Sequence, residues 1–507
     1  MSNQNTTIAK NTLFLSIRMV FVLFVSLYTS RVFLNVLGVV DYGISNVVAG
    51  FVSMFGFLNT SMSNAIQRFY NAELGKSGKE GVTKVYNTSL VIQTIIAVFV
   101  LILLETVGLW YLYEKMVIPE DRFQVAFWLF QFSTISSVVV IMQSPYSAAI
   151  MAYERMNTYA IFSILDVVLK LGFAFLLPLV PIDQLFTYGA FYLAVSILNF
   201  MLNYGYCKIH FKELHAQRFF SKGMFKNMIS FSGWNLLGTF ACVAREQGLN
   251  LVLNLFFGPA VNAARGIAYQ VSGAMQGFVS NLSLAAKPQM VQSYATGESS
   301  RTMKLMYTMS KLSFLFLYML SVPVIFNVDY ILHLWLGDVV PEHTSSFVIL
   351  VLLASFMNNL NAPLSNVVYA TGRMKKYEIT FTSINLLIIP ISYIVLSLGA
   401  PAEAAFIVYF VLTIFVQLGC LIVLRSLTNL SLKQYVSSLC LPIAAICMIV
   451  TPFIWWISKS IGIGCVAIIV EYVIIGILTS ILSFLLLFDR NEKSILISMI
   501  GKITRKR

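Results

Sequence analysis

Residues 245–271, REQGLNLVLNLFFGPAVNAARGIAYQV, contain the features that decide the fold. They join the end of one apolar stretch, residues 227–256, to the start of another, residues 260–287, through a Gly-Pro pair. Each stretch is long enough to cross about 30 Å of hydrocarbon as a helix. Arg245 and Arg265 lie inside these stretches, although an arginine at such a position costs about 2.5 to 3.5 kcal/mol to insert. The segment therefore predicts a membrane-spanning helical hairpin with charged groups in its interior.

Apolar stretches of this kind recur along the whole chain. Of the 507 residues, 58% are hydrophobic and only 11% are charged, and the mean hydropathy is +0.81. A soluble domain of this length would carry far more charge. We therefore expect an all-α polytopic membrane protein with about fourteen transmembrane helices. Their approximate cores are residues 11–37, 43–66, 86–112, 123–150, 157–181, 185–207, 227–256, 260–287, 305–335, 346–370, 378–398, 402–425, 434–457 and 461–488.

The basic residues are divided unevenly between the two sets of predicted loops. With the amino terminus inside, the inner loops and the tail contain most of them, and the outer loops contain Lys115, Arg122 and Lys459. Because lysine and arginine favour the cytoplasmic side, both termini are predicted to be cytoplasmic. The first helix is too long for a signal-peptide core, so we expect it to remain as a span. The net charge of +13 follows from this topology and does not indicate a nucleic-acid partner.

Two regions of the chain have similar sequences. Residues 32–38 read VFLNVLG, residues 251–258 read LVLNLFFG, and a segment rich in glycine, alanine and serine follows each. The similarity predicts two six-helix lobes, residues 1–215 and 220–430, related by a parallel repeat. Two additional helices and a basic cytoplasmic tail, residues 431–507, would follow. Chance similarity between two apolar hairpins is the alternative explanation.

Two of the predicted helices, 43–66 and 260–287, are rich in glycine and in hydroxyl or amide side chains. A helix that faces lipid does not need these polar groups. They would permit close helix packing, because small residues let backbones approach and amides form hydrogen bonds between helices. They would also suit the wall of a hydrophilic passage, and the two interpretations are compatible.

Residues 245–259, residues 261–271 and the Asp-Tyr-Gly hairpin at 41–43 resemble the bacterial polysaccharide flippases, the Wzx-type O-antigen and capsule exporters of the multidrug/oligosaccharidyl-lipid/polysaccharide exporter superfamily. The resemblance covers essentially the full chain in length, helix count and two-lobe layout. It implies a flippase in the bacterial inner membrane that moves undecaprenyl-pyrophosphate-linked oligosaccharide from the cytoplasmic to the periplasmic leaflet by alternating access. A coupling ion, H⁺ or Na⁺, and glycan polymerase machinery are the further partners that we expect.

Arginines inside the predicted helices suggest a water-filled cationic cavity, which suits an anionic substrate. The candidate residues for substrate binding are Arg245, Arg18, Arg31 and Arg265. Arg245 is the strongest of them, because it lies near the middle of its predicted helix, where its side chain cannot snorkel to water. Arg18 and Arg31, about 20 Å apart along one helix, could instead reach opposite membrane surfaces. Arg265, about 10 Å inside the outer boundary, could anchor the helix at the interface.

Three further charged residues are candidates for ion coupling or for an internal ion pair. Asp166 and Lys170 are four positions apart, the spacing at which opposite charges meet on one face of a helix. We expect them to neutralise each other in the bundle, with a proton or cation relay as the alternative. Glu246 points about 100° away from its neighbour Arg245, so we expect a partner on another helix or a role in ion coupling.

Two other classes of protein compete with the flippase interpretation. A drug/cation antiporter of the same superfamily would favour an acidic cavity, whereas the predicted helix interiors have an excess of basic residues. A membrane glycan polymerase or ligase would need a large external loop with catalytic groups, and the longest predicted one, about 336–345, lacks arginine and lysine. The sequence contains no phosphate-binding P-loop and no H-E-x-x-H, and its six cysteines lack ligand spacing. We therefore expect no cofactor, no metal and no enzymatic activity.

Overall fold

The computed structural model describes most of the chain. The described side chains exclude those of residues 2–17 and 75–78 and some of those between residues 234 and 295. The backbone is described for residues 2–76, 78–215, 221–371, 373–428, 430–462, 464–489 and 492–494.

All the regular elements among the described residues are helices, as the sequence predicted. The α-helices are α1 (Ser2–Ser53), α2 (Gly56–Lys76), α3 (Gly78–Leu103), α4 (Leu109–Glu114), α5 (Phe123–Ala152), α6 (Met156–Leu176), α7 (Gln184–His210), α8 (Lys222–Phe257), α9 (Pro259–Ala295), α10 (Ser299–Phe326), α11 (Val328–Leu336), α12 (Thr344–Thr371), α13 (Lys375–Ser397), α14 (Glu403–Thr428), α15 (Leu432–Tyr435), α16 (Leu441–Ile461) and α17 (Cys465–Leu482). Short helical turns join or extend some of them, at η1 (Leu104–Gly108), η2 (Glu120–Arg122), η3 (Leu177–Leu179), η4 (Val436–Cys440) and η5 (Ser483–Leu487).

Eleven segments in the described part of the chain are long and apolar enough to span a membrane. The helices α2, α8 and α9 are not among the eleven. The structure thus confirms a polytopic membrane protein. The break predicted after residue 37 is present as a kink in α1 at Gly38. Other breaks were not predicted: a turn at residues 54–55 separates α1 from α2 within the predicted helix 43–66, and a break at Asn327 divides the predicted helix 305–335 into α10 and α11.

Two glycines interrupt the helical path with almost the same backbone conformation. Gly38 has φ 76° and ψ 171°, and Gly258 has φ 73° and ψ −171°. Both φ values lie in the region that disfavours residues with a Cβ atom, which explains glycine at these positions. The two residues end the similar sequences VFLNVLG and LVLNLFFG, so the repeated sequence is accompanied by a repeated backbone turn.

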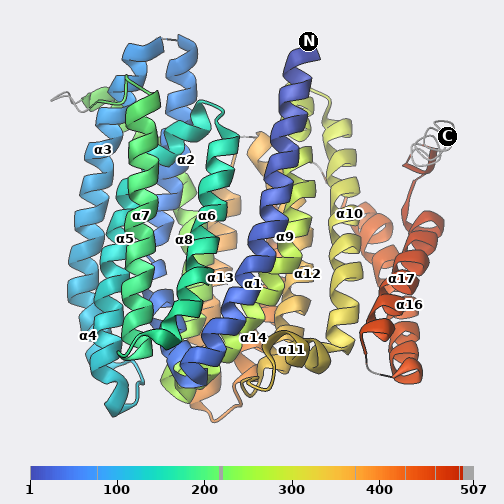
Figure 1. The fold of residues 1–507 in the computed structure, drawn as a ribbon. Coiled ribbons are helices and arrows are strands. Elements are labelled where there is room, and N and C mark those ends of the chain that lie inside the picture. The colour runs from blue at the N-terminus through green and yellow to red at the C-terminus, as the bar shows by residue number, and fades with distance from the viewer. Residues whose placement is uncertain are drawn as a thin grey trace. The chain divides into compact units, whose positions relative to one another are not determined.

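The chain forms two compact units, each assembled from separate segments. Unit 1 comprises Met1–Ile267, Trp335–Thr344 and Asn385–Val408, and unit 2 comprises Ala268–Leu334, Ser345–Ile384 and Tyr409–Arg507. In unit 1, α5 packs against α3 and α7, and α1 packs against α6 (Figure 1). In unit 2, α16 and α17 pack against each other and against α10. The lobes at 1–215 and 220–430 stay a prediction.

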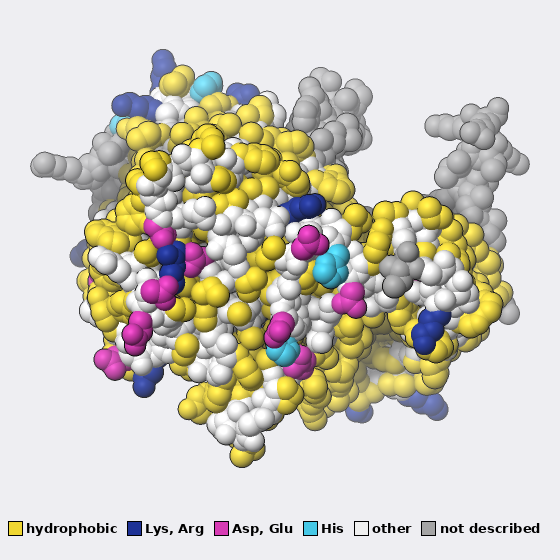
Figure 2. All heavy atoms as spheres, turned by 60° about the horizontal axis from the view of Figure 1, so that its bottom comes forward, with side chains coloured by type: hydrophobic (Ala, Val, Ile, Leu, Met, Phe, Trp, Pro, Cys, Tyr) yellow, Lys and Arg dark blue, Asp and Glu magenta, His cyan; other side chains and the backbone are white. Residues whose placement is uncertain are grey.

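Apolar side chains remain exposed along the helices, as expected for surfaces that contact lipid. Ile102 in α3 is 56% exposed, and Met448 in α16 is 70% exposed. Acidic and histidine side chains are set among apolar ones on the face shown in Figure 2. Isolated apolar residues on a surface are ordinary, but many large ones in succession on long helices indicate a lipid-facing surface.

An ion-pair cluster ties three elements of unit 1 together. The Arg122 guanidinium in η2 contacts both carboxylate oxygens of Asp41 in α1, and its Nη1 donates to Oδ2 of Asp183 at 2.6 Å. Asp183 also caps α7, because its Oδ1 accepts hydrogen bonds from the backbone N–H groups of Leu185 and Phe186. Arg122 therefore joins α1, just after the kink at Gly38, to the start of α7.

Candidate anion-binding site

The helix α8 carries a buried arginine far from either of its ends. It has 36 residues, and Arg245 lies about 18 Å before its C-terminus. The residue is only 7% exposed. A side chain at this depth cannot reach the surface by extending along the helix. Its charge must therefore be balanced locally by other protein groups or by a ligand.

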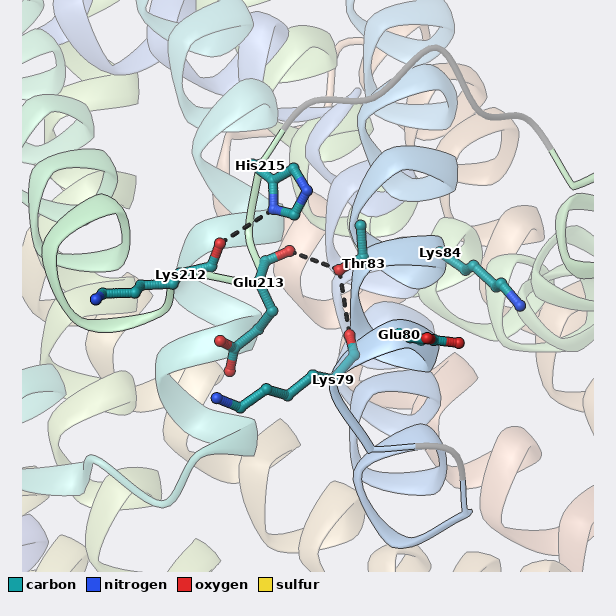
Figure 3. A pocket seen from close by; sticks show the side chains of 7 residues that line it. All are labelled: Lys79, Glu80, Thr83, Lys84, Lys212, Glu213 and His215. Carbon is teal, nitrogen blue, oxygen red and sulfur yellow. Dashed lines mark hydrogen bonds between the residues drawn. The ribbon is translucent and has the colours of Figure 1, made fainter.

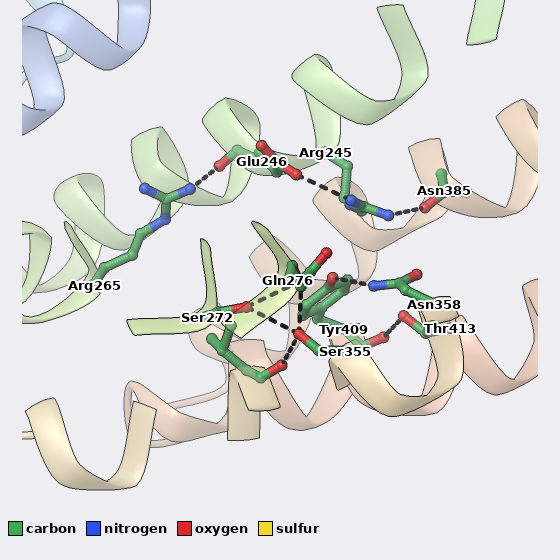
Figure 4. A network of polar contacts seen from close by, with 11 residues as sticks. Arg245, Glu246, Arg265, Ser272, Gln276, Ser355, Asn358, Asn385, Tyr409 and Thr413 are labelled. Atoms are coloured by element: carbon green, nitrogen blue, oxygen red, sulfur yellow. Dashed lines mark hydrogen bonds and ion pairs between the residues drawn. The ribbon is translucent and has the colours of Figure 1, made fainter. Parts of the chain in front are cut away.

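Within the described part of the chain, the Arg245 guanidinium donates hydrogen bonds to the side chains of Asn385 and Glu246. Nη1 donates to Oδ1 of Asn385 in α13 at 2.8 Å, and Nη2 donates to Oε1 of Glu246 at 3.2 Å (Figure 4). Glu246 thus forms an ion pair within its own helix, although the sequence did not make Arg245 an obvious partner. The Cβ atoms of adjacent helical residues do point in different directions, but both side chains are long enough to bend toward each other.

The second arginine of the hairpin meets the first at the same residue. Arg265 in α9 is 5% exposed, and its Nη2 donates to the backbone oxygen of Glu246. Figure 4 shows Glu246 with Arg245 on one side and Arg265 on the other. The burial of Arg265 argues against the interfacial anchoring that was the alternative for this residue. We call Arg245, Glu246, Arg265 and Asn385 the arginine cluster.

The carboxylate of the cluster is much more exposed than the arginines. The Glu246 side chain is 41% exposed, whereas the Arg245 side chain is 8% exposed. A carboxylate at this depth is costly against acyl chains, so its exposed part has to face water or a polar ligand. The three ionic side chains bring together two formal positive charges and one negative charge, an arrangement that can attract an anion.

The other two candidate arginines contact different elements. Arg18 Nη1 donates to Oγ of Ser163 in α6 at 3.4 Å, and its guanidinium lies 5.2 Å from the centre of the Tyr159 ring. Arg31 lies near Gly337, where a methyl group on the glycine would be 3.7 Å from Arg31 Nη2. The structure thus joins Arg245 to Arg265 and places Arg18 and Arg31 in other surroundings of unit 1. Their roles in substrate binding stay predictions.

The charged pair predicted in the fifth span is formed. Lys170 Nζ donates to Oδ2 of Asp166 at 2.8 Å, at the expected i, i+4 spacing. Asp166 Oδ1 also accepts from Asn199 of α7 at 2.7 Å, and Lys170 Nζ lies 5.2 Å from the centre of the Tyr192 ring. These contacts fit an internal ion pair that joins α6 and α7. A role in ion coupling stays a prediction.

Unit 2 contains a separate polar network that the sequence revealed only in part. Ser272 and Gln276 of α9 contact the Ser355 hydroxyl of α12, each at 2.9 Å. Asn358 donates to the Tyr409 hydroxyl at 2.8 Å (Figure 4). In the sequence, Ser272 and Gln276 are recognisable as polar residues within an apolar stretch. Ser355, Asn358 and Asn385 are also polar residues within apolar stretches, but their partners lie far away in the sequence and could not be predicted.

Comparisons with known proteins identify the fold. No family model and no curated protein matches the chain. Among solved structures, the lipid II flippase MurJ in an inward closed conformation has 15% identity and a TM-score of 0.73, over 94% of this chain and 98% of that one. An inward-facing multidrug resistance MATE family transporter of the MOP superfamily has 13% identity and a TM-score of 0.66, over 80% and 96%.

A third similar structure is a MOP superfamily transporter from Pyrococcus furiosus, described by a reverse polarity of its binding pocket. It has 12% identity and a TM-score of 0.55, over 82% of this chain and 96% of that one. At such low identity these likenesses concern the fold. The chain shares its fold with these structures, which include a lipid II flippase and a multidrug resistance MATE family transporter.

Proposed function

We propose that this protein is a flippase that carries undecaprenyl-pyrophosphate-linked oligosaccharide from the cytoplasmic to the periplasmic leaflet of a bacterial inner membrane. The observation that carries the proposal is the arginine cluster, in which Arg245 and Arg265 are buried on either side of Glu246. The pyrophosphate would bind at this cluster while the polyprenyl chain stays in lipid. Both termini are cytoplasmic in this proposal.

The chemistry of the cluster suits a diphosphate. A guanidinium group presents several N–H donors in a plane, and it forms short, charge-assisted hydrogen bonds to phosphate oxygens. Arg245 already uses one nitrogen on a neutral amide and another on the half-exposed carboxylate of Glu246. A phosphate oxygen could replace that carboxylate and restore the charge balance. Exchange of a protein anion for a substrate anion also provides a way to release the substrate.

Transport would proceed by alternating access, in which the two predicted lobes rock around the bound head group. Arg18 and Arg31 would contribute further positive charge along the path. The ion pair of Asp166 and Lys170 is the candidate for coupling to H⁺ or Na⁺. Glycan polymerase machinery would act on the product after its release at the periplasmic face.

The main alternative is a drug/cation antiporter, since MATE family transporters share the fold. A site for organic cations should present more negative than positive charge to its ligand. The arginine cluster has the opposite balance, with two guanidinium groups around one carboxylate. The polymerase or ligase alternative receives less support, because the segment between α11 and α12 is short and its His343 contacts Glu403 at 2.6 Å.

The direct test follows lipid-linked oligosaccharide across the membrane of proteoliposomes that contain the purified protein. We expect Arg245→Ala to reduce the transport rate at least tenfold, because a charge-assisted contact to a phosphate contributes about 1.5 to 3 kcal/mol. The matched control is Arg301→Ala, since Arg301 is 65% exposed and pairs with Glu298 on the surface. Unchanged movement with Arg245→Ala would remove Arg245 from the mechanism. Export of a cationic dye by the wild type, without glycolipid movement, would favour the antiporter.

A further inference from the structure

A pocket of about 540 Å³ lies at the N-terminal end of α3, beside the segment that follows α7 (Figure 3). It is lined from one side by Lys79, Glu80, Thr83 and Lys84 of α3, and from the other by Lys212, Glu213 and His215. All these residues belong to unit 1. The pocket is separate from the arginine cluster, and the function proposed above does not use it.

Hydrogen bonds from buried residues hold one wall of the pocket in place. Thr83 Oγ1 donates to the backbone oxygen of Glu213 at 2.8 Å, and Asn87 Nδ2 donates to that of His215 at 3.2 Å. The Tyr153 hydroxyl donates to Oε1 of Glu213, and the Tyr153 ring stacks on Phe211 at 4.2 Å between centroids. The wall is therefore preformed, and a ligand would not have to order it on binding.

The charges in the pocket favour an anion. Figure 3 shows Lys79 and Lys212 extending on the same side of α3 as Glu213, whereas Lys84 extends the other way. Glu213 keeps its negative charge while its Oε1 accepts from the Tyr153 hydroxyl, so two ammonium groups accompany one carboxylate at this side. Over the whole lining, three lysines outnumber two glutamates, Glu80 and Glu213. A lysine ammonium is a compact charge that suits a phosphate oxygen. A phosphate group carries the matching charge and fits easily in the pocket volume.

The position of the pocket indicates where the phosphate comes from. The pocket lies where two candidate spans end, Lys79–Glu114 and Gln184–His210, which is the depth of the lipid head groups. The span α7, which ends beside the pocket, has exposed apolar side chains, with Met201 62% exposed and Ile209 74% exposed. An acyl chain could contact this apolar surface while the head group enters the pocket. A soluble phosphate compound would gain nothing from that surface.

We propose that this pocket binds the phosphate-bearing head group of an anionic phospholipid of the surrounding leaflet, with Lys79 and Lys212 contacting the phosphate. The lipid would be a bound component of the folded protein and not the transported substrate. In the orientation proposed above, this leaflet is the cytoplasmic one.

The test measures lipid binding to the purified, delipidated protein by native mass spectrometry. Phosphatidylglycerol and phosphatidylcholine with identical acyl chains are titrated separately, and glycerol 3-phosphate is added as a soluble competitor. The pocket variant is Lys79→Gln/Lys212→Gln. The control is Lys304→Gln/Lys375→Gln, which removes the same charge from two exposed lysines that do not line the pocket. The lipid titrations do not measure transport. A failure to bind phosphatidylglycerol would therefore leave the proposed function unaffected, and a failure of transport would leave the lipid site unaffected.

We expect the wild type to bind phosphatidylglycerol more tightly than phosphatidylcholine. Each lysine that contacts the anionic head group should increase the affinity about fivefold. The pocket variant should lose this preference and the control variant should keep it. The proposal is overturned if the wild type shows no preference, or if the control variant loses it to the same extent. Displacement of the lipid by millimolar glycerol 3-phosphate would also overturn it, because the site would then be one for a soluble phosphate.

Discussion

At the scale of single residues, Glu246 decides how the arginine cluster responds to an anion. Its carboxylate accepts from Arg245 Nη2 and its backbone oxygen accepts from Arg265 Nη2, so one residue holds both guanidinium groups. The two contacts differ in kind. The side chain can leave without unfolding the helix, whereas the backbone oxygen stays where it is. Arg265 is therefore a fixed element of the site, and Arg245 is the group that can exchange partners.

Glu246→Gln should strengthen the binding of a diphosphate. The substitution keeps the size of the side chain but removes the negative charge that competes for Arg245, so we expect about tenfold tighter binding of polyprenyl diphosphate. Transport should become slower, because the competing carboxylate no longer helps release. Isothermal titration in detergent measures the affinity. Glu105→Gln is the matched control, since Glu105 is another carboxylate within a span and contacts Gln131 at 3.3 Å. Weaker binding by the Glu246→Gln variant would mean that the carboxylate positions Arg245 and does not compete.

The sequence predicts the location of the buried charges better than their contacts. Arg245 stood out because hydropathy and helix length place it deep in the membrane, and these quantities depend on sequence alone. Its partners could not be predicted in the same way. Asn385 lies on a helix 140 positions away, and the pairing with Glu246 depends on how two flexible side chains bend. The angle between Cβ atoms on a helix does not determine such a contact.

At the scale of elements, Arg122 links α1, η2 and α7 through Asp41 and Asp183. Burial alone would raise the pKa of Asp183, but hydrogen bonds from Arg122 and from backbone N–H groups outweigh it and hold the pKa below its ordinary value. A carboxyl with a lowered pKa stabilises the fold at a pH above its unfolded-state pKa, and this stability is lost as the pH falls through the folded-state value.

Asp183→Asn should therefore lower the Tm at neutral pH, and the difference from the wild type should shrink as the pH falls below about 4. Thermal unfolding in detergent between pH 3 and pH 7 measures both effects. Asp121→Asn is the control, because Asp121 is exposed and directly precedes Arg122. A Tm difference that does not change with pH would show that the cap of α7, and not the charge of Asp183, supplies the stability.

A second ion pair holds the residues after α17 against α10. Lys311 is 2% exposed, and its Nζ lies 2.9 Å from Oε2 of Glu492 and 4.0 Å from Oδ1 of Asp489. Removal of one partner leaves a buried charge without its main counter-ion, at a cost of about 3 to 5 kcal/mol. Glu492→Gln should therefore lower the Tm strongly, whereas Lys311→Met/Glu492→Gln should recover most of the loss.

The exposed pair of Arg301 and Glu298 provides the control for this experiment. Their side chains are 65% and 52% exposed, so Glu298→Gln should change the stability by less than about 1 kcal/mol. Equal Tm values for Glu492→Gln and Glu298→Gln would contradict the assignment of Glu492 as the counter-ion of a buried charge. A double variant no better than Glu492→Gln would show that Lys311 stabilises the fold through other contacts.

At the scale of the whole molecule, hydropathy and helix period predict the class of fold because every span must satisfy its own backbone in lipid. The same rule explains why the helix positions agree well. The break predicted after residue 37 is present as the kink at Gly38, whereas the break at Asn327 interrupts an apolar stretch that looks continuous. Neighbour relations, such as α10 with the residues after α17, depend on tertiary packing and leave no signal in one sequence.

Among the described glycines of unit 1, Gly43 has the least room for a side chain, and the neighbour lies in a distant segment. A Cβ atom there would lie 1.8 Å from the backbone oxygen of Pro259, which cannot move without moving the turn between α8 and α9. Gly43→Ala should therefore force the middle of α1 away from the start of α9. Overpacking of this kind typically costs about 1 to 3 kcal/mol. Two states of a transporter differ by only a few kcal/mol, so this cost is large enough to change their populations.

We expect Gly43→Ala to reduce the population of the conformation seen in this structure by roughly 5-fold to 150-fold, if the alternative conformation of the transport cycle relieves the clash. Hydrogen–deuterium exchange should then increase in the second half of α1 and in the first turns of α9, together with a changed transport rate. Gly172→Ala is the matched control, since a Cβ atom at Gly172 would meet nothing within 4 Å. Similar exchange in both variants would show that the approach of Gly43 to Pro259 does not distinguish the states, and the conformational equilibrium would then have to depend on contacts elsewhere in the chain.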